Sequence, residues 1–527
     1  MQIDRFVSTL VTVAVPVASS PGQAPAARVD RAERLPTESA AALPRPTWLS
    51  RSRVQAGLLV LAPMLLLLFA RYFVASTDPD YWWHVRTGQY IIETGTLPRA
   101  DIYSYTVPDR PWVAHEWLTE VLLYVVQQRF GYVGNVALFG LLAMLTSLAV
   151  YATCRVRGVG EPSAAMLMLW AAGIGLGSAN VRPQLLTTFL LAVCALLLTL
   201  YLRGQTRALW PYPALMALWV NLHGGYVIGL VLLGLTVVGQ GAARVLGRPV
   251  EPLRPLVLTA LLSGMATLIS PHGLEAIFYP FSYVGSENAM MRYIAEWQSI
   301  DFHRSESLIF AGSLLLAILL GVGRRPLGPT EALWTVALAL MALQSVRHVA
   351  LYGVVATPLL AARLQETFPL LRGTLATWHR PKLLVVIWPL VAILLLRLAF
   401  VGGGWEHAQV GREPNATTYP SGAVEHLRTH DLPGNLFASY HWGGYLIYEL
   451  YPERSVFIDG RTDVYAELVG RYYEVVTLRR TWREVLDQYE VRLVLIEKEG
   501  PLAVVLADDP SWQLAFAGDV EQLFVRR

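Results

Sequence analysis

The stretch Asp78-Pro79-Asp80-Tyr81-Trp82-Trp83-His84 directly follows the first segment of the chain that is long and apolar enough to cross a bilayer. It carries two carboxylates one residue apart, followed by an aromatic pair and a histidine. Ionisable side chains are costly to hold at a membrane, and they concentrate at functional sites. The stretch therefore predicts a membrane protein with a polar functional site beside its first span.

The composition agrees with this prediction. Of the 527 residues, 54% are hydrophobic and only 15% are charged, and the mean hydropathy is +0.42. This balance is typical of a polytopic membrane protein, so the net charge of +3 is no sign of a nucleic-acid partner. Cys154 and Cys194 both lie in apolar runs. Their position excludes a disulfide framework and a cysteine metal site.

Apolar segments recur along the chain at the length that a bilayer requires. A helix needs roughly 20 apolar residues to cross about 30 Å of hydrocarbon. We expect about eleven spans, at residues 54–74, 133–154, 163–179, 183–202, 208–222, 226–243, 256–269, 307–322, 331–343, 348–362 and 383–401.

The arginines predict the orientation of these spans, because short cytoplasmic loops collect positive charge. With the amino terminus inside, every inner loop is positive. Residues 6–18 resemble a signal peptide, but Pro16 interrupts the run, and cleavage would turn the basic loops outward. The inner-side basic residues are Arg51, Arg53, Arg155, Arg157, Arg203, Arg207, Arg244, Arg248, Arg324, Arg325, Arg363, Arg372, Arg380 and Lys382.

The chain divides into three predicted parts. Residues 1–52, rich in Ala, Pro, Arg and Glu, are expected to be a disordered cytosolic tail. Residues 53–402 form the all-α transmembrane domain, and an odd number of spans leaves residues 403–527 outside as a small α/β domain. In that domain we expect helices at 423–430, 464–478 and 481–489, and strands at 446–449, 455–458, 491–496, 503–505 and 520–525.

The first outer loop is long and contains two amphipathic stretches. Residues 81–93 repeat apolar positions at helical spacing, with Asp80 placed to cap that helix and Gly95 to end it. A second stretch, residues 118–130, stops at Gly131. The pattern predicts surface helices that lie along the membrane.

Polar residues at other span ends fall on the same outer side. Arg182 and Arg347 are the most informative, because topology disfavours positive charge there and an anionic ligand such as a phosphate would retain it. The candidate substrate-binding residues are His84, His115, Glu116, Arg182, Asn221, His223, Arg347 and His348.

Each candidate also has a structural interpretation. Asp78 and Asp80 are suited to capping a surface helix. For His115 and Glu116, the alternative to substrate binding is a divalent metal site, and no further cofactor is expected. His223 beside Gly224 and Gly225 suits a tight turn, and Arg182 and Arg347 suit structural pairing with carboxylates.

The Asp78-Pro79-Asp80 motif at the start of a helical first outer loop resembles the acidic motif of the GT-C membrane glycosyltransferases, which use polyprenyl-phosphate-linked sugars. The chain is also similar to a large set of bacterial multi-span proteins. The matching segments are Asp80-Tyr81-Trp82-Trp83-His84, His115-Glu116-Trp117-Leu118, Trp219-Val220-Asn221-Leu222-His223-Gly224-Gly225, Trp442-Gly443-Gly444-Tyr445-Leu446 and Phe457-Ile458-Asp459-Gly460-Arg461.

The resemblance implies a bacterial inner-membrane enzyme with Asp80 or Asp78 as its catalytic carboxylate. The donor would be a polyprenyl-phosphate-linked sugar, and the acceptor an extracytoplasmic lipid, glycan or protein. The outer domain has no tryptophan-aspartate acceptor motif, which weakens the case for a protein acceptor. A lipid or glycan transporter and an envelope-assembly scaffold are the alternatives.

The segment around Asp459-Gly460-Arg461 has two interpretations. It predicts a turn in which Gly460 supplies a positive φ. Alternatively, its charged and aromatic neighbours would form a sugar-binding surface, made of Tyr440, His441, Trp442, Asp459, Arg461 and Asp463.

Overall fold

The computed structural model describes residues 61–62, 64–66, 68–69, 78–174, 180–280, 293–304, 307–322, 327–368, 419–465 and 468–527. The predicted tail at 1–52, the predicted span at 383–401 and most of the predicted span at 54–74 lie outside the described residues. The boundaries predicted between the three parts therefore stay a prediction.

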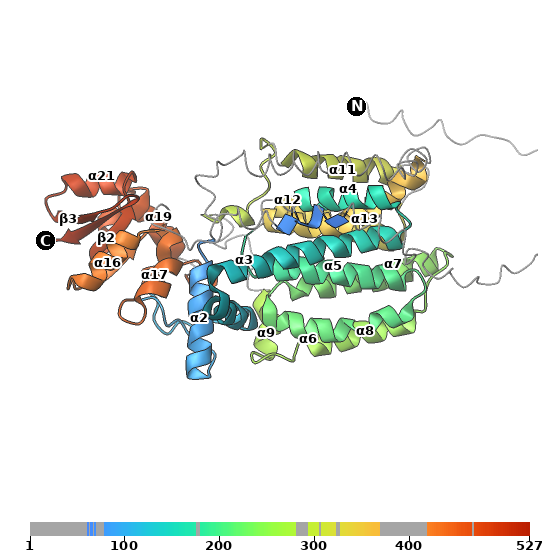
Figure 1. Ribbon diagram of the computed structural model, residues 1–527, viewed down its shortest axis with the longest axis horizontal. Coiled ribbons are helices and arrows are strands. Elements are labelled where there is room, and N and C mark those ends of the chain that lie inside the picture. The colour runs from blue at the N-terminus through green and yellow to red at the C-terminus, as the bar shows by residue number, and fades with distance from the viewer. Residues whose placement is uncertain are drawn as a thin grey trace, which may run out of the picture. The chain divides into compact units, whose positions relative to one another are not determined.

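Long apolar helices make up the first part of the described chain. In Figure 1, α3, α5, α7 and α8 run in one common direction, and α2 runs across it. The most extensive helix contacts join α3 to α2 and α5, α13 to α4 and α12, and α12 to α7. The helices are α2 (Tyr81–Thr94), α3 (Trp117–Val156), α4 (Glu161–Ile174), α5 (Gln184–Tyr201), α6 (Tyr212–Leu222), α7 (Tyr226–Val245), α8 (Leu253–Ala266), α9 (Leu274–Phe278), α11 (Ser307–Val322), α12 (Pro329–Gln344) and α13 (Val349–Thr367), with short 3-10 turns η3 (Thr206–Leu209), η5 (Ala295–Trp297) and η6 (Val346–His348).

The structure confirms a mostly helical chain, whereas the count of about eleven spans stays a prediction. Among the described residues, α3, α5 and α7 are long and apolar enough to cross a membrane. Helices α4, α8 and α11 are apolar but shorter. The 14 residues of α8 cover only about 21 Å at 1.5 Å per residue, which is less than the hydrocarbon thickness.

Two glycines shape the first loop as the sequence predicts. Gly95 ends α2 with a φ of 67°, and its N–H donates to the Ile91 carbonyl. At Gly131 the backbone takes φ 64° and ψ −169°, so α3 is kinked there and continues to Val156. The predicted break at Gly131 is therefore a kink within α3.

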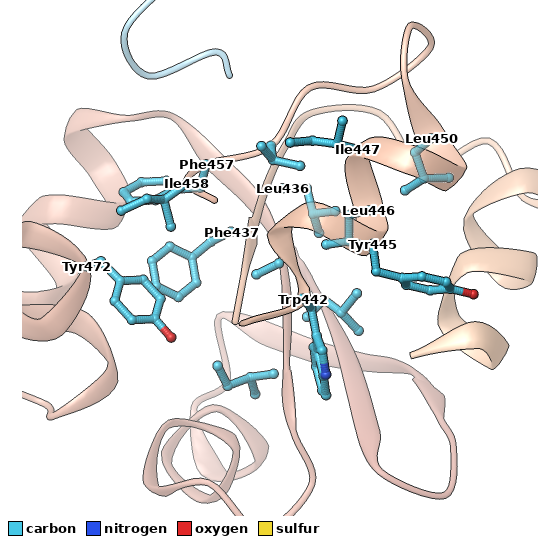
Figure 2. Packing of buried hydrophobic residues seen from close by; sticks show 14 of the residues in the cluster. Leu436, Phe437, Trp442, Tyr445, Leu446, Ile447, Leu450, Phe457, Ile458 and Tyr472 are labelled. Atoms are coloured by element: carbon cyan, nitrogen blue, oxygen red, sulfur yellow. The ribbon is translucent and has the colours of Figure 1, made fainter. Parts of the chain in front are cut away.

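The carboxyl-terminal part folds around a mixed sheet with the order β1-β2-β4-β3. Strand β1 (Asn435–Ala438) pairs parallel with β2 (Val491–Glu497), and β4 (Glu521–Arg526) pairs antiparallel with β2 and with β3 (Trp512–Ala517). Figure 2 shows the rings of Phe437, Phe457 and Tyr472 packed together in the core. The accompanying helices are α16 (Ser421–Thr429), η7 (Tyr440–Trp442), α17 (Gly443–Leu450), α18 (Thr462–Tyr465), α19 (Leu468–Val476), α20 (Trp482–Gln488) and α21 (Pro501–Asp508).

Three predicted strands are wrong. Residues 446–449 lie in α17, where Leu446, Ile447 and Leu450 are buried at helical spacing. Residues 503–505 lie in α21, which Pro501 starts. Within residues 455–458, only Val456 forms isolated bridges, to Ser104 and Leu436. Short apolar runs cannot be assigned to helix or strand by periodicity alone, which explains these errors.

The first loop and the carboxyl-terminal part share one hydrophobic core. Trp82 of α2 packs against Tyr445 and Tyr448 of α17, with ring centroids 5.8 and 4.8 Å apart. Thr106 Oγ1 donates to the Phe457 carbonyl at 2.7 Å. These contacts bring residues 457–463 beside Asp80, which is how the carboxyl-terminal part reaches the site.

Candidate functional site

A cavity of about 890 Å³ lies at the end of the bundle where α2, α3 and α5 begin and α6 and α12 end. One wall is apolar and comes from α3, α4 and α13, with Val150, Met168 and Leu351 among its residues. The rest is polar and comes from the loops. The polar lining includes Asp80, His84, His115, Glu116, Glu120, Arg182, His223, Glu296, Arg347, His348 and Asp463.

Arg182 joins three carboxylates in this cavity. Its Nη2 donates to Asp80 Oδ2 at 2.8 Å, while Nε contacts Asp78 and Nη1 contacts Glu296. The side chain of Asp80 caps no backbone N–H of α2; it accepts instead from Arg182 and, at 3.2 Å, from Trp83 Nε1. The capping interpretation of Asp80 is therefore wrong, and the pairing of Arg182 with carboxylates is observed.

The two aspartates of the motif have different environments. Asp78 is buried, accepts the Asp80 N–H at 2.9 Å and lies outside the cavity lining. Burial raises the pKa of Asp78 to about 6, although the positive charge of Arg182 opposes the change. Burial alone would lower the pKa of Arg182, but the surrounding carboxylates raise it well above its ordinary value. Asp80 lines the cavity, so it is the aspartate that a substrate can reach.

Gly460 packs directly against Asp80. A Cβ at this position would lie 1.7 Å from Asp80 Oδ1, so only glycine fits. The φ of Gly460 lies outside the left-handed region, which makes the predicted positive φ wrong. The residue is required for close approach and not for a turn.

Arg347 lies in η6, and its side chain faces the same cavity as Asp80. Its guanidinium lies 4.6 Å from the centroid of the Trp297 ring. Its Nε is 4.0 Å from Glu296 Oε2. Glu296 is therefore shared between Arg182 and Arg347, and we call this part of the cavity the arginine end.

A second polar region of the cavity is built around Glu116, and we call it the histidine end. The Nε2 atoms of His84, His115 and His223 lie 3.5, 3.4 and 3.2 Å from its carboxylate oxygens. Gly225 N–H donates to His223 Nδ1 at 2.8 Å, so the proton of a neutral His223 is on Nε2 and faces Glu116. His84 also approaches Glu120 with Nδ1 at 3.4 Å, so both of its nitrogens face carboxylates.

The pKa directions follow from this packing. Burial alone would raise the pKa of Glu116, but the three imidazoles hold it well below its usual range. Burial alone would lower the pKa of His84 and His115, and the neighbouring carboxylates raise both above the ordinary value. Burial lowers the pKa of His223 to about 3, with Glu116 opposing the change. Protonation is therefore favoured at His84 and His115 and disfavoured at His223.

Within the described part of the chain, no group of three or more His, Cys, Asp or Glu residues is placed to hold a metal ion. The imidazole nitrogens around Glu116 are at hydrogen-bond distance from its oxygens, which is not a set of ligands around a common centre. A divalent metal at His115 and Glu116 stays a prediction, and no step below depends on it.

Two of the predicted site residues lie outside the cavity lining. Asn221 of α6 accepts from Trp117 Nε1 at 2.9 Å and donates to the Ala217 and Ile269 carbonyls. It therefore links α6 to the start of α3 and to the residues after α8. Asp78 lies behind Arg182, as described above. The other predicted residues, namely Asp80, His84, His115, Glu116, Arg182, His223, Arg347 and His348, line one cavity.

Sequence reasoning missed Glu120 and Glu296 as site residues. Glu120 follows Glu116 by four residues near the start of a helix, and this spacing is a signal that it shares a face with Glu116. Glu296 carries no such signal, because long-range packing brings it to the cavity. Of the predicted sugar-binding surface, Arg461 and Asp463 line the cavity, whereas Trp442 and Asp459 are buried outside its lining.

Comparisons with known proteins place the fold. No family model and no curated protein matches the chain. Solved structures do match, and the chain shares its fold with the oligosaccharyltransferase, ArnT and arabinofuranosyltransferase structures described below, which confirms the resemblance at the level of the fold.

Three of these structures are most informative. The oligosaccharyltransferase AglB from Archaeoglobus fulgidus, solved with an inhibitory peptide and a dolichol-phosphate, aligns with a TM-score of 0.57 at 12% identity over 85% of this chain and 70% of AglB. ArnT from Cupriavidus metallidurans aligns with 0.51 at 12% identity, over 90% and 98% of the two chains. The arabinofuranosyltransferase AftD from Mycobacteria aligns with 0.50 at 13% identity, over 90% of this chain and 40% of AftD. At these identities the likeness defines a multi-span membrane fold, and the activity must be argued from the site.

Proposed function

We propose that this protein is a membrane glycosyltransferase that transfers a sugar from a polyprenyl-phosphate carrier to an extracytoplasmic lipid, glycan or protein acceptor. One observation carries the proposal. Asp80 and Arg347, far apart in sequence, line one cavity that also contains Arg182 and an apolar wall. A carboxylate, two guanidiniums and an apolar wall are what a lipid-linked phosphosugar requires.

In the proposed reaction, an acceptor hydroxyl or amine attacks the anomeric carbon on the face opposite the phosphate. Asp80 takes the acceptor proton as the new bond forms. The bond between the anomeric carbon and the phosphate oxygen breaks, and its electron pair leaves with the phosphate. Arg182 and Arg347 stabilise the negative charge that develops on the phosphate. Because the acceptor attacks on the face opposite the phosphate, the transfer inverts the anomeric configuration.

Glu296 gives the arginine end a way to receive the phosphate. Its side chain is 42% exposed, more than that of Arg182 or Asp80. An incoming phosphate that displaces Glu296 would exchange one anionic partner of Arg182 for another. The exchange leaves Asp80 in contact with Arg182, so the base keeps its position while the lipid binds.

We further propose that the cavity opens on the extracytoplasmic side of a bacterial inner membrane. Arg157, Arg203 and Arg363 gather with Glu331 at the opposite end of the same helices. The positive-inside rule assigns that arginine-rich end to the cytoplasm. A protease added outside spheroplasts should then remove a tag placed after Arg527, and protection of the tag would contradict this orientation.

A transporter or an assembly scaffold is the alternative. Transporters place their substrate sites near the bilayer midplane on broken helices. Here the charged residues of the cavity lie at helix ends, which favours chemistry at the membrane surface. Substrate flux in vesicles without product formation would reverse the ranking.

The experiment that tests the proposal uses purified protein and lipid-linked sugars, with release of polyprenyl phosphate as the readout. Asp80→Asn should lower turnover by about 10²–10⁴-fold, the usual contribution of a general base. Asp508→Asn, a matched change at an exposed residue, should leave turnover unaltered. Wild-type turnover in Asp80→Asn would overturn the assignment of the base.

A further inference from the structure

Two buried polar atoms beside the histidine end lack partners. Glu120 Oε2 and Arg461 Nη1 have no hydrogen-bond partner among the described residues, and both residues line the cavity. Glu120 is 1% exposed and Arg461 is 2% exposed. Both groups have charged partners through their other atoms. A buried polar atom without a hydrogen bond is nevertheless unfavourable, so a ligand that bonds both atoms would be stabilised here.

The two atoms have opposite hydrogen-bonding roles. The carboxylate oxygen of Glu120 accepts, and the guanidinium nitrogen of Arg461 donates. A single phosphate satisfies only the donor, and an ammonium satisfies only the acceptor. Hydroxyl groups on one ring satisfy both, because each hydroxyl both donates and accepts.

Aromatic rings connect the two positions. Arg461 lies 4.6 Å from the Trp112 ring, Trp112 lies 6.3 Å from Trp83, and Trp83 lies 3.6 Å from His84, which contacts Glu120. Trp83 and Trp112 also line the cavity. Flat apolar surfaces flanked by a few polar groups are typical of sites for small rigid ligands.

The same region adjoins the proposed base. Trp83 Nε1 donates to Asp80, and Gly460, the residue before Arg461, packs on Asp80. Asp463 from α18 adds a further carboxylate to the lining, held by Tyr279 Oη–H at 3.0 Å. A ring held here would lie next to Asp80.

From these contacts we infer that Glu120, Arg461 and Asp463, with Trp83 and Trp112, form a subsite for a polyhydroxylated sugar ring. The inference rests on the proposed function and adds the group that the cavity recognises. Hydroxyl groups of the ring bond Glu120 Oε2, Arg461 Nη1 and the Asp463 carboxylate. The ring belongs either to the lipid-linked donor or to a glycan acceptor, which present the same chemistry.

The test compares bare and sugar-bearing lipids. Equilibrium binding of undecaprenyl phosphate, and of undecaprenyl phosphate carrying a hexose or a pentose, is measured with the full chain in nanodiscs. Wild-type protein should prefer one sugar-bearing lipid by at least about tenfold, because a site built for hydroxyls rejects ligands that lack them. Glu120→Gln and Asp463→Asn should each reduce this preference by about tenfold and leave binding of undecaprenyl phosphate unchanged.

Controls separate this subsite from folding and from the proposed function. Glu93→Gln changes an exposed glutamate of α2 and should keep the preference. If the donor preference is kept but the KM for a methyl glycoside acceptor rises tenfold, the subsite holds the acceptor ring. Folded Glu120→Gln and Asp463→Asn proteins with unchanged preference and unchanged KM would overturn the inference. In that case loss of turnover in Asp80→Asn would still support the proposed function.

Discussion

Arg182 and Arg461 are both arginines held by two aspartates, yet their surroundings differ. Arg461 contacts Asp101 and Asp459 at 2.7 Å, and the side chains of all three are 1% exposed or less. Arg182 is 18% exposed and its partners Asp80 and Glu296 are 23% and 42% exposed. A sealed ion pair is fixed in place, whereas a partly open one can exchange a partner. The comparison teaches that burial, and not residue type, separates the arginine with fixed partners from the arginine whose partner can be exchanged.

The largest effect is expected from breaking the buried cluster of Arg461, Asp101 and Asp459, which we call the sealed cluster. Arg461→Ala would leave Asp101 and Asp459 buried without their positive partner. Removing one partner of a buried pair costs about 3–5 kcal/mol, so the unfolding temperature in detergent should fall sharply. Arg483→Ala, at an exposed arginine paired with Asp509, should change stability by less than about 1 kcal/mol. Equal effects of the two changes would contradict the proposed distinction.

Gly460 precedes Arg461 in the sequence and packs against Asp80, a partner of Arg182. Gly460→Ala therefore tests the region where the surroundings of the two arginines meet. The added Cβ would clash with Asp80 Oδ1 and displace the carboxylate. A displacement of about 1 Å at the reacting centre lowers rate about 10²-fold, so kcat for polyprenyl phosphate release should fall by that factor. Gly264→Ala, where a Cβ meets nothing, is the matched control. Normal kcat in folded Gly460→Ala would show that Asp80 needs no fixed position.

The raised pKa of Asp78, a partner of Arg182, predicts that the stability of the protein depends on pH. Its pKa is raised in the folded protein from 3.8 to about 6, so the folded state binds the proton more tightly than the unfolded chain. The contribution to stability is complete below the unfolded pKa and is lost as pH rises through about 6. Between about pH 4.5 and 6.5 the loss is about 2 kcal/mol.

The measurement is the unfolding temperature of wild type and Asp78→Asn across this range. The variant keeps an acceptor for the Asp80 N–H but does not titrate, so the decline with pH should be shallower. Parallel curves for the two proteins would show that another group is responsible.

Arg182→Lys should produce the smallest of these effects. An ammonium on a flexible stem does not reproduce the planar fork that contacts Asp78, Asp80 and Glu296. KM for the lipid-linked sugar should rise about tenfold, which corresponds to about 1.4 kcal/mol, with little change in the unfolding temperature. An unchanged KM would indicate that Arg347 alone holds the phosphate.

The sequence predicted the features that depend on local chemistry. Gly95 and Gly131 were identified from where the helical pattern stops, and α11 was predicted with its observed bounds of Ser307–Val322. The strands that failed were short apolar runs, for which local pattern carries too little information. β1 and β3 were missed because these strands form through pairing with β2 and β4, and this pairing is not evident in the local pattern of β1 or β3.

In the candidate site, too, some residues could be predicted from local chemistry and others depend on long-range packing. Asp80, Arg182 and Arg347 stood out because charge beside an apolar span is costly wherever the chain folds. The roles of Glu296, Gly460 and Arg461 depend on segments far apart in sequence that pack together. The sequence pattern around Asp459-Gly460-Arg461 could not distinguish an exposed surface from a buried pair, because burial is a property of the packed core.

The kink at Gly131 links the height of the site to the membrane. Glu120 lies 11 residues before Gly131, about 17 Å along a helix at 1.5 Å per residue, and the spanning stretch begins just after it. If residues 132–156 cross the bilayer as predicted, the angle of the helix at Gly131 sets where Glu116 and Glu120 lie relative to the lipid headgroups. A change in bilayer thickness would then alter the position at which a lipid phosphate meets the two arginines.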